Sequence, residues 1–103
     1  MTRVYLATDL ASLRALHEHD ELPAGSYTAF VPEDDDEETE YTTLQEAAEH
    51  ARREHGRHLA LAADLDSGDI GADAPPVPIA RIAAIHVDED LAWFAVQELD
   101  QVL

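Results

Sequence analysis

The chain has 103 residues, of which 23 are acidic, six are arginine and none is lysine, so its formal net charge is -17. A field of this sign repels nucleic acid, anionic lipid and acidic substrates, and it favours cations or basic protein partners. The absence of cysteine excludes disulfides, a thiolate nucleophile and cysteine-ligated zinc. The length predicts one domain, residues 1–103.

The apolar content of 46% predicts a packed core in spite of the charge. The opening MTRVYLATDLASL has no apolar run long enough for a signal peptide or a membrane span, so we expect a cytoplasmic protein with no membrane contact. An excess of acids without lysine is also typical of the whole proteome of a halophile. The use of arginine in place of lysine is typical of a high-GC genome. These proteome-wide explanations stay open beside any functional one.

The first half of the chain predicts two strands and two helices. Residues 3–7 (RVYLA) predict a strand, after which Thr8 or Asp9 caps a helix that ends near His19. The β-branched and aromatic run YTAFV predicts the second strand, which Pro32 stops. The second helix is indicated by a stripe at spacings of three and four, formed by Tyr41, Leu44, Ala48, Ala51 and His55, and Gly56 follows it as a left-handed cap.

The second half predicts three more strands. HLALAAD (58–64) is almost continuously apolar, as in a central strand covered on both faces. SGDIGADAPPVP (67–78) predicts a loop, because it is rich in glycine and proline. IARIAAIHV (79–87) and LAWFAV (91–96) predict the last strands, and QELDQVL (97–103) a short helix or tail.

The order β-α-β-α-β-β predicts a two-layer α/β domain, with right-handed crossovers, a mixed sheet of four to five strands and two main helices. Several segments together resemble a family of small uncharacterised proteins from high-GC bacteria that has only a domain-of-unknown-function label: RVYLATDLASLRAL, EETEYTTLQEAA, LALAAD, PVPIARIAAIHVDED and LAWFAVQELDQVL. The resemblance implies an α/β fold and a cytosolic bacterial setting, but no activity and no site. The chain looks shorter than these relatives around residues 67–78.

Seven acids crowd the start of the second predicted helix: Glu33, Asp34, Asp35, Asp36, Glu37, Glu38 and Glu40. Acids at this end of a helix interact well with its dipole, and Asp35 or Asp36 can cap it. Two or three acids would suffice for that role. We therefore expect the surplus to serve solubility or a surface that binds a basic protein partner, which favours a non-enzymatic interaction or regulatory protein without a cofactor.

A second interpretation of the same helix is nucleic-acid mimicry. Helical neighbours three or four residues apart lie about 5 to 6 Å from each other, close to the spacing of successive phosphates. A row of this kind is available in Glu37, Glu38, Glu40, Glu46 and Glu49. The chain would then inhibit a DNA- or RNA-binding protein while binding no nucleic acid itself.

A third interpretation places a metal at the strand ends. Asp9 follows the first predicted strand, and Asp64 and Asp66 end the third. Carboxylates that converge at the carboxyl ends of parallel strands could hold Mg²⁺ for a hydrolase. The same positions suit aspartates that cap helices and form turns.

The histidines and arginines carry weaker signals. His50, His55 and His58 match no zinc spacing, and His55 is expected on the buried stripe. His50 shares a helical face with Glu54 and could hold a metal weakly. The basic residues near the end of the helix, Arg52, Arg53 and Arg57, are explained by the helix dipole and by pairing with Glu49 or Glu54, or as one half of a contact between copies of the chain.

Overall fold

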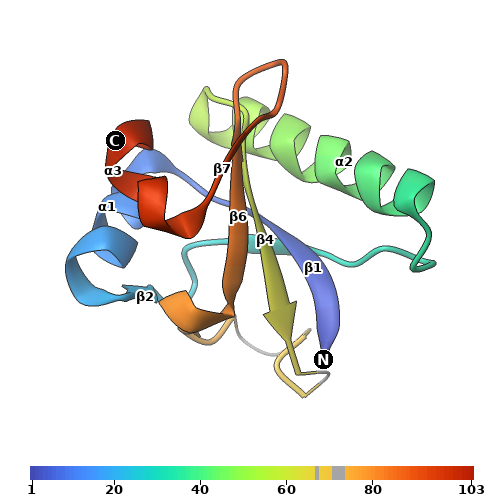
Figure 1. Cartoon of the computed structure of the whole chain (residues 1–103), viewed down its shortest axis with the longest axis horizontal. Coiled ribbons are helices and arrows are strands. Elements are labelled where there is room, and N and C mark those ends of the chain that lie inside the picture. The colour runs from blue at the N-terminus through green and yellow to red at the C-terminus, as the bar shows by residue number, and fades with distance from the viewer. Residues whose placement is uncertain (67, 71–73) are drawn as a thin grey trace.

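Five strands form the central sheet, with one long helix across it (Figure 1). The computed structural model describes residues 1–66, 68–70 and 74–103. Its elements, in chain order, are β1 (Thr2–Ala7), α1 (Leu10–His19), β2 (Glu21–Leu22), β3 (Thr28–Phe30), α2 (Glu37–His55), β4 (Leu59–Leu65), β5 (Val77–Pro78), the 3₁₀ helix η1 (Ile79–Arg81), β6 (Ile82–Val87), β7 (Ala92–Phe94), the 3₁₀ helix η2 (Val96–Glu98) and α3 (Leu99–Val102). The predicted α/β class, strand number and two main helices are confirmed.

The sheet is more regular than the mixed sheet expected from the sequence. Its strand order is β3-β1-β4-β6-β7, and all four pairings are antiparallel. The register of β1 against β4 runs from Thr2 opposite Leu65 to Ala7 opposite Ala60. The carboxyl end of β1 therefore lies beside the amino end of β4. Residues that follow β1 and residues that follow β4 are at opposite ends of the strands.

The face of the sheet under α2 is lined by alanine. Phe30 contacts His50 of α2 edge-on, with ring centroids 5.4 Å apart, so its cross-strand partner Tyr5 also faces α2. The residues of this face next to Tyr5 are small and buried: Ala7, Ala60, Ala62 and Ala84. The helix meets them with Ala47, Ala48 and Ala51, all at most 1% exposed. We call these seven alanines the alanine seam; their small side chains permit a close approach of helix and sheet.

The opposite face carries large aliphatic side chains. Leu6 pairs with Leu61, and Leu61 pairs with Ile85, which makes a row across three strands with no solvent exposure. Figure 1 shows α1 and α3 on the side of the sheet away from α2. Fully buried Leu13 and Leu16 of α1 belong to the same core. The near-continuous apolar run of β4 is explained by this cover on both faces.

An aspartate begins each of the two long helices, and a residue with left-handed backbone ends each of them. The Ser12 backbone N–H donates to Asp9 Oδ1 (2.7 Å), and the Thr39 N–H donates to Asp36 Oδ1 (2.8 Å), so an aspartate caps each helix. Gly56 ends α2 with a φ of 83°. Asp20 ends α1 in the same left-handed region, at a φ of 58°.

Some local predictions are corrected. Val77–Pro78, within the predicted loop 67–78, forms β5 and pairs with β2, which was not expected; residues 67 and 71–73 of that loop lie outside the described residues. The predicted strands 79–87 and 91–96 are shortened by η1 and η2. Tyr41 and His55 are exposed rather than part of the buried stripe, because α2, about 28 Å long, extends past the three strands it covers.

Candidate functional site

The seven acids of residues 33–40, here called the acidic segment, project into solvent at the start of α2. Glu33 to Glu38 are exposed and Glu40 is partly buried. Asp36 serves the helix, because the hydrogen bond from Thr39 lowers the pKa of its carboxyl group and holds it ionised. Glu37, Glu38 and Glu40 lie in the first turn, where the helix dipole favours negative charge. Glu33, Asp34 and Asp35 neither cap the helix nor lie in its first turn.

A shallow groove adjoins the acidic segment. It has a volume of about 370 Å³ and is lined by three glutamates, three threonines and one valine: Glu33, Glu38, Glu46, Thr39, Thr42, Thr43 and Val31. Val31 directly follows the edge strand β3 and is 44% exposed. The groove therefore combines negative charge at its rim with an apolar contact, which suits a long basic side chain with an alkyl stem.

Four of the six arginines pair with acids outside the acidic segment. Arg3 Nε lies 2.8 Å from Asp64 Oδ1, Arg52 Nη2 lies 2.6 Å from Glu49 Oε1, and Arg57 Nε lies 3.2 Å from Asp88 Oδ1. A fourth arginine, Arg81, approaches Asp66 at 3.7 Å. Within the described part of the chain, no arginine or histidine forms an ion pair with the acidic segment. The exposed acids of the segment therefore have no ion-pair partner among the described residues.

A tight polar cluster forms near the other end of α2. Glu49 receives hydrogen bonds from Arg52 and lies 3.3 Å from His58 Nε2. The bonds from Arg52, and then the contact with His58, lower the pKa of Glu49 to about 2. Glu49 therefore stays ionised, but Arg52 compensates its negative charge. The phosphate-like row expected along α2 loses its last member.

The predicted Mg²⁺ set of Asp9, Asp64 and Asp66 is not brought together. Asp64 lies opposite Arg3 at the start of β1 and forms an ion pair with it, whereas Asp9 follows the end of the same strand. The strand rises about 13 Å between Arg3 and Ala7, so Asp9 and Asp64 cannot share an ion that needs ligands at about 2.1 Å. The expectation failed because the strands are antiparallel. Asp9 instead caps α1.

Asp9 also lies near His55, which is positively charged when protonated. Burial opposes ionisation of Asp9, but its hydrogen bonds with Ser12 and the nearby His55 outweigh this and lower its pKa. His55 Nδ1 lies 4.0 Å from Asp9 Oδ2. His50 packs against Phe30, as a core-edge residue does. Among the described residues, no group of three or more histidines and acids is placed to hold a metal ion.

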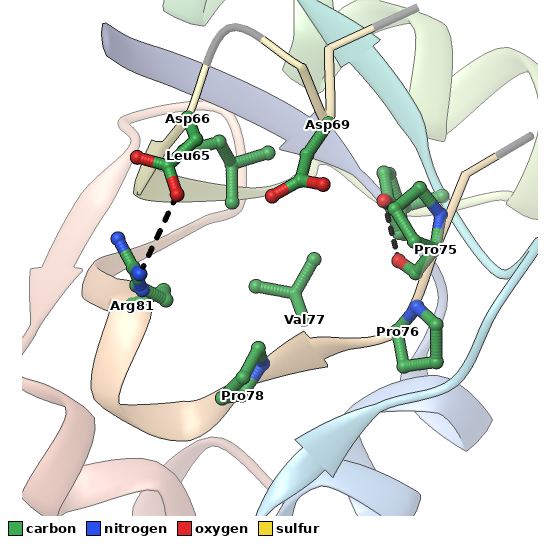
Figure 2. A pocket seen from close by; sticks show the side chains of 9 residues that line it. Leu65, Asp66, Asp69, Pro75, Pro76, Val77, Pro78 and Arg81 are labelled. Atoms are coloured by element: carbon green, nitrogen blue, oxygen red, sulfur yellow. Dashed lines mark hydrogen bonds and ion pairs between the residues drawn. The ribbon is translucent and has the colours of Figure 1, made fainter. Parts of the chain in front are cut away.

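Sequence reasoning missed a cavity at the end of β4. It lies between Asp66 and Asp69 on one side and the run Pro75 to Pro78 on the other, in a region expected to be only a loop (Figure 2). The three prolines in this run could have indicated a rigid wall, since each fixes its backbone φ. The carboxylates that face the wall depend on the tertiary fold and could not be found from spacing.

Comparison with known proteins places the chain in a family. A model of a family of unknown function, DUF6912, matches residues 2–90, which include every element from β1 to β6. No curated protein and no solved structure matches the chain. In the described part of the chain, no helix has both the length and the apolar character needed to cross a membrane.

Proposed function

The chain belongs to DUF6912, a family of unknown function, and we propose that it is a small cytosolic interaction or regulatory protein that binds a basic protein partner through the acidic segment. One observation supports this above all: the paired arginines of the chain are bound to acids elsewhere, while the exposed acids of the segment have no cation of their own in the described structure. Lysine and arginine residues of a partner would supply that charge.

The groove beside the segment gives the contact some specificity. A lysine or arginine side chain that enters it would place its alkyl stem on Val31 and its charge near Glu33 and Glu38. Exposed Tyr41 (55%) lies one helical turn after Glu37 and Glu38 and can add an aromatic contact to a cation. The bound partner segment is therefore expected to alternate basic and small or apolar residues.

The test separates the location of the charge from its total amount. The immobilised chain is used to capture proteins from a bacterial lysate, and it is titrated with a synthetic lysine- and arginine-rich peptide, at low and high salt. The triple variant Glu33→Gln, Asp34→Asn, Glu37→Gln keeps the Asp36 cap. The control triple variant removes the same charge at exposed acids far from the groove in sequence, and it carries Glu18→Gln, Glu21→Gln and Asp100→Asn.

The acidic-segment variant should bind the peptide roughly tenfold more weakly at low salt, since three exposed ion pairs contribute about 0.5 kcal/mol each. The control variant should stay close to the parent, and high salt should weaken all three. Equal losses in the two variants would mean that only net charge matters. Retention of no basic protein at either salt concentration would refute the proposal.

Nucleic-acid mimicry is the narrower alternative. Glu37, Glu38 and Glu46 remain exposed on α2, but the pairing of Glu49 with Arg52 shortens the row. The same capture experiment distinguishes the two ideas. A mimic would retain DNA- or RNA-binding proteins and release them when duplex DNA or RNA is added, whereas a general acidic surface would not show that competition.

A further inference from the structure

The cavity at the end of β4 is a small, partly enclosed site that shares no lining residue with the acidic groove (Figure 2). Its volume is about 220 Å³. Leu65 (4% exposed) and Val77 (1% exposed) belong to the buried core and give the cavity an apolar floor. Pro75, Pro76 and Pro78 line it as well, and polar and apolar surfaces contribute about equally to its walls.

The charged groups at the cavity leave an excess of one negative charge. Asp66 Oδ2 lies 3.7 Å from Arg81 Nη2, and this pair is close to neutral. Asp69 supplies a second carboxylate, which Figure 2 shows turned toward the space between Leu65, Val77 and Pro75. The Asp69 backbone N–H donates to the Asp66 carbonyl oxygen (2.9 Å), so a hydrogen bond links the backbones of the two acids.

The proline wall is held in place by Tyr27. The Tyr27 hydroxyl group donates a hydrogen bond to the Pro75 carbonyl oxygen (2.7 Å). Burial, and then the negative charge of Asp69, raise the pKa of Tyr27, so the hydroxyl group keeps its proton and this bond at neutral pH. The wall is therefore fixed by a side chain from a segment 48 residues earlier in the chain.

We propose that this cavity binds a small primary alkylammonium ligand. The ammonium group donates hydrogen bonds to the Asp69 carboxylate, and the alkyl chain lies on Leu65, Val77 and the proline wall. An anion is disfavoured because Arg81 is already paired and Asp69 repels it. Mg²⁺ or Ca²⁺ is disfavoured because each takes six or more oxygen ligands, whereas the carboxylates lining the cavity are those of Asp69 and of Asp66, which is paired with Arg81.

The test follows amide resonances of Leu65 and Val77 by NMR while the intact chain is titrated with butylammonium. Butanol and butyrate serve as neutral and anionic probes of similar shape. Butylammonium should shift these resonances saturably, with a Kd on the order of 1 mM, because a ligand of five heavy atoms makes few contacts. Butanol should bind much more weakly and butyrate not at all.

Three variants locate the charge that recognises the ligand. Asp69→Asn should weaken butylammonium binding about tenfold, since it removes a charged hydrogen-bond acceptor. Asp34→Asn is the matched control, because it removes one exposed charge in the acidic segment and should leave binding unchanged. Arg81→Gln should tighten binding, because it removes the cation that offsets Asp66.

Several results would overturn the proposal. These are the absence of a saturable shift at Leu65 and Val77, equal binding of butanol and butylammonium, and equal weakening by Asp69→Asn and Asp34→Asn. A blocked lysine amide extends the test to an ammonium group carried on a polypeptide. If it binds and butylammonium does not, the cavity recognises a residue of a protein partner, and the small-ligand proposal is wrong.

Discussion

Enlarging one residue of the alanine seam should separate α2 from the sheet. Ala47 is fully buried at the centre of α2, opposite a face of the sheet that is also lined by alanine. Ala47→Leu adds three carbon atoms where neither surface can recede without moving backbone. Overpacking of this kind costs about 1 to 3 kcal/mol of the free energy of unfolding. For a domain of this size, that loss lowers Tm by roughly 5 to 20 °C.

The assay is urea unfolding followed by circular dichroism, with a thermal melt of the same samples. Ala11→Leu is the matched control, because Ala11 lies on the exposed side of α1 and the same atoms are added in solvent. The control should unfold within about 0.5 kcal/mol of the parent. If Ala47→Leu also stays within that margin, helix and sheet are not in close contact at the seam, and the reasoning is refuted.

Three further predictions concern charge and capping. Asp36→Ala should lower the free energy of unfolding by about 1 kcal/mol, and Asp36→Asn by much less, because asparagine can accept the same hydrogen bond from Thr39; equal losses in urea unfolding would assign the effect to charge. Burial lowers the pKa of His86 below 6.5, so its contribution to stability is full above that pH and is lost as the pH falls through the folded-state value. His86→Gln should flatten this acid loss in urea unfolding at a series of pH values, and an unchanged slope would assign it to other groups. In thermal melts the parent should gain Tm with added salt, and the triple variant Glu33→Gln, Asp34→Asn, Glu37→Gln should gain less because fewer like charges remain; a variant that melts well below the parent would reveal specific contacts of these acids.

Local signals predicted the elements of the fold well. Asp9 and Gly56 mark helix ends through their own hydrogen bonding and backbone freedom, and the structure uses both as the sequence indicates. The apolar run at residues 58–64 correctly predicts a strand buried on both faces. These features depend on neighbours within a few residues, which is why spacing along the chain is enough to find them.

Strand direction was beyond the reach of those signals. Whether β4 runs parallel or antiparallel to β1 depends on how α2 returns the chain, and no residue pattern in either strand specifies it. The Mg²⁺ hypothesis needed parallel strands, and the antiparallel pairing separates Asp9 from Asp64. The pairing of β2 with β5 was missed for a similar reason, since a two-residue strand has no measurable periodicity and Pro78 argues locally against one.

The candidate sites divide along the same line. The acidic segment is visible in the sequence because six of its seven members, Glu33 to Glu38, are consecutive, although only the structure shows that the paired arginines are bound to other acids. Eight of the nine residues that line the cavity beside Asp69 lie between Leu65 and Arg81, but only the tertiary fold sets the acids opposite the prolines and adds Tyr27.

The alanine seam gives the two sides of the sheet different resistance to opening. Alanine side chains bury little area, so α2 is attached to the sheet through Leu44, Thr43, the contact of His50 with Phe30 and the methyl groups of the seam, whereas α1 is anchored by leucines. Sub-global opening takes the route that exposes the least apolar surface. Amide protons of α2 should therefore exchange with solvent through detachment of the helix. They should exchange faster than those of β1 and β4, which exchange only through global unfolding. The helix that presents the acidic segment is thus expected to leave the sheet more readily than α1 does.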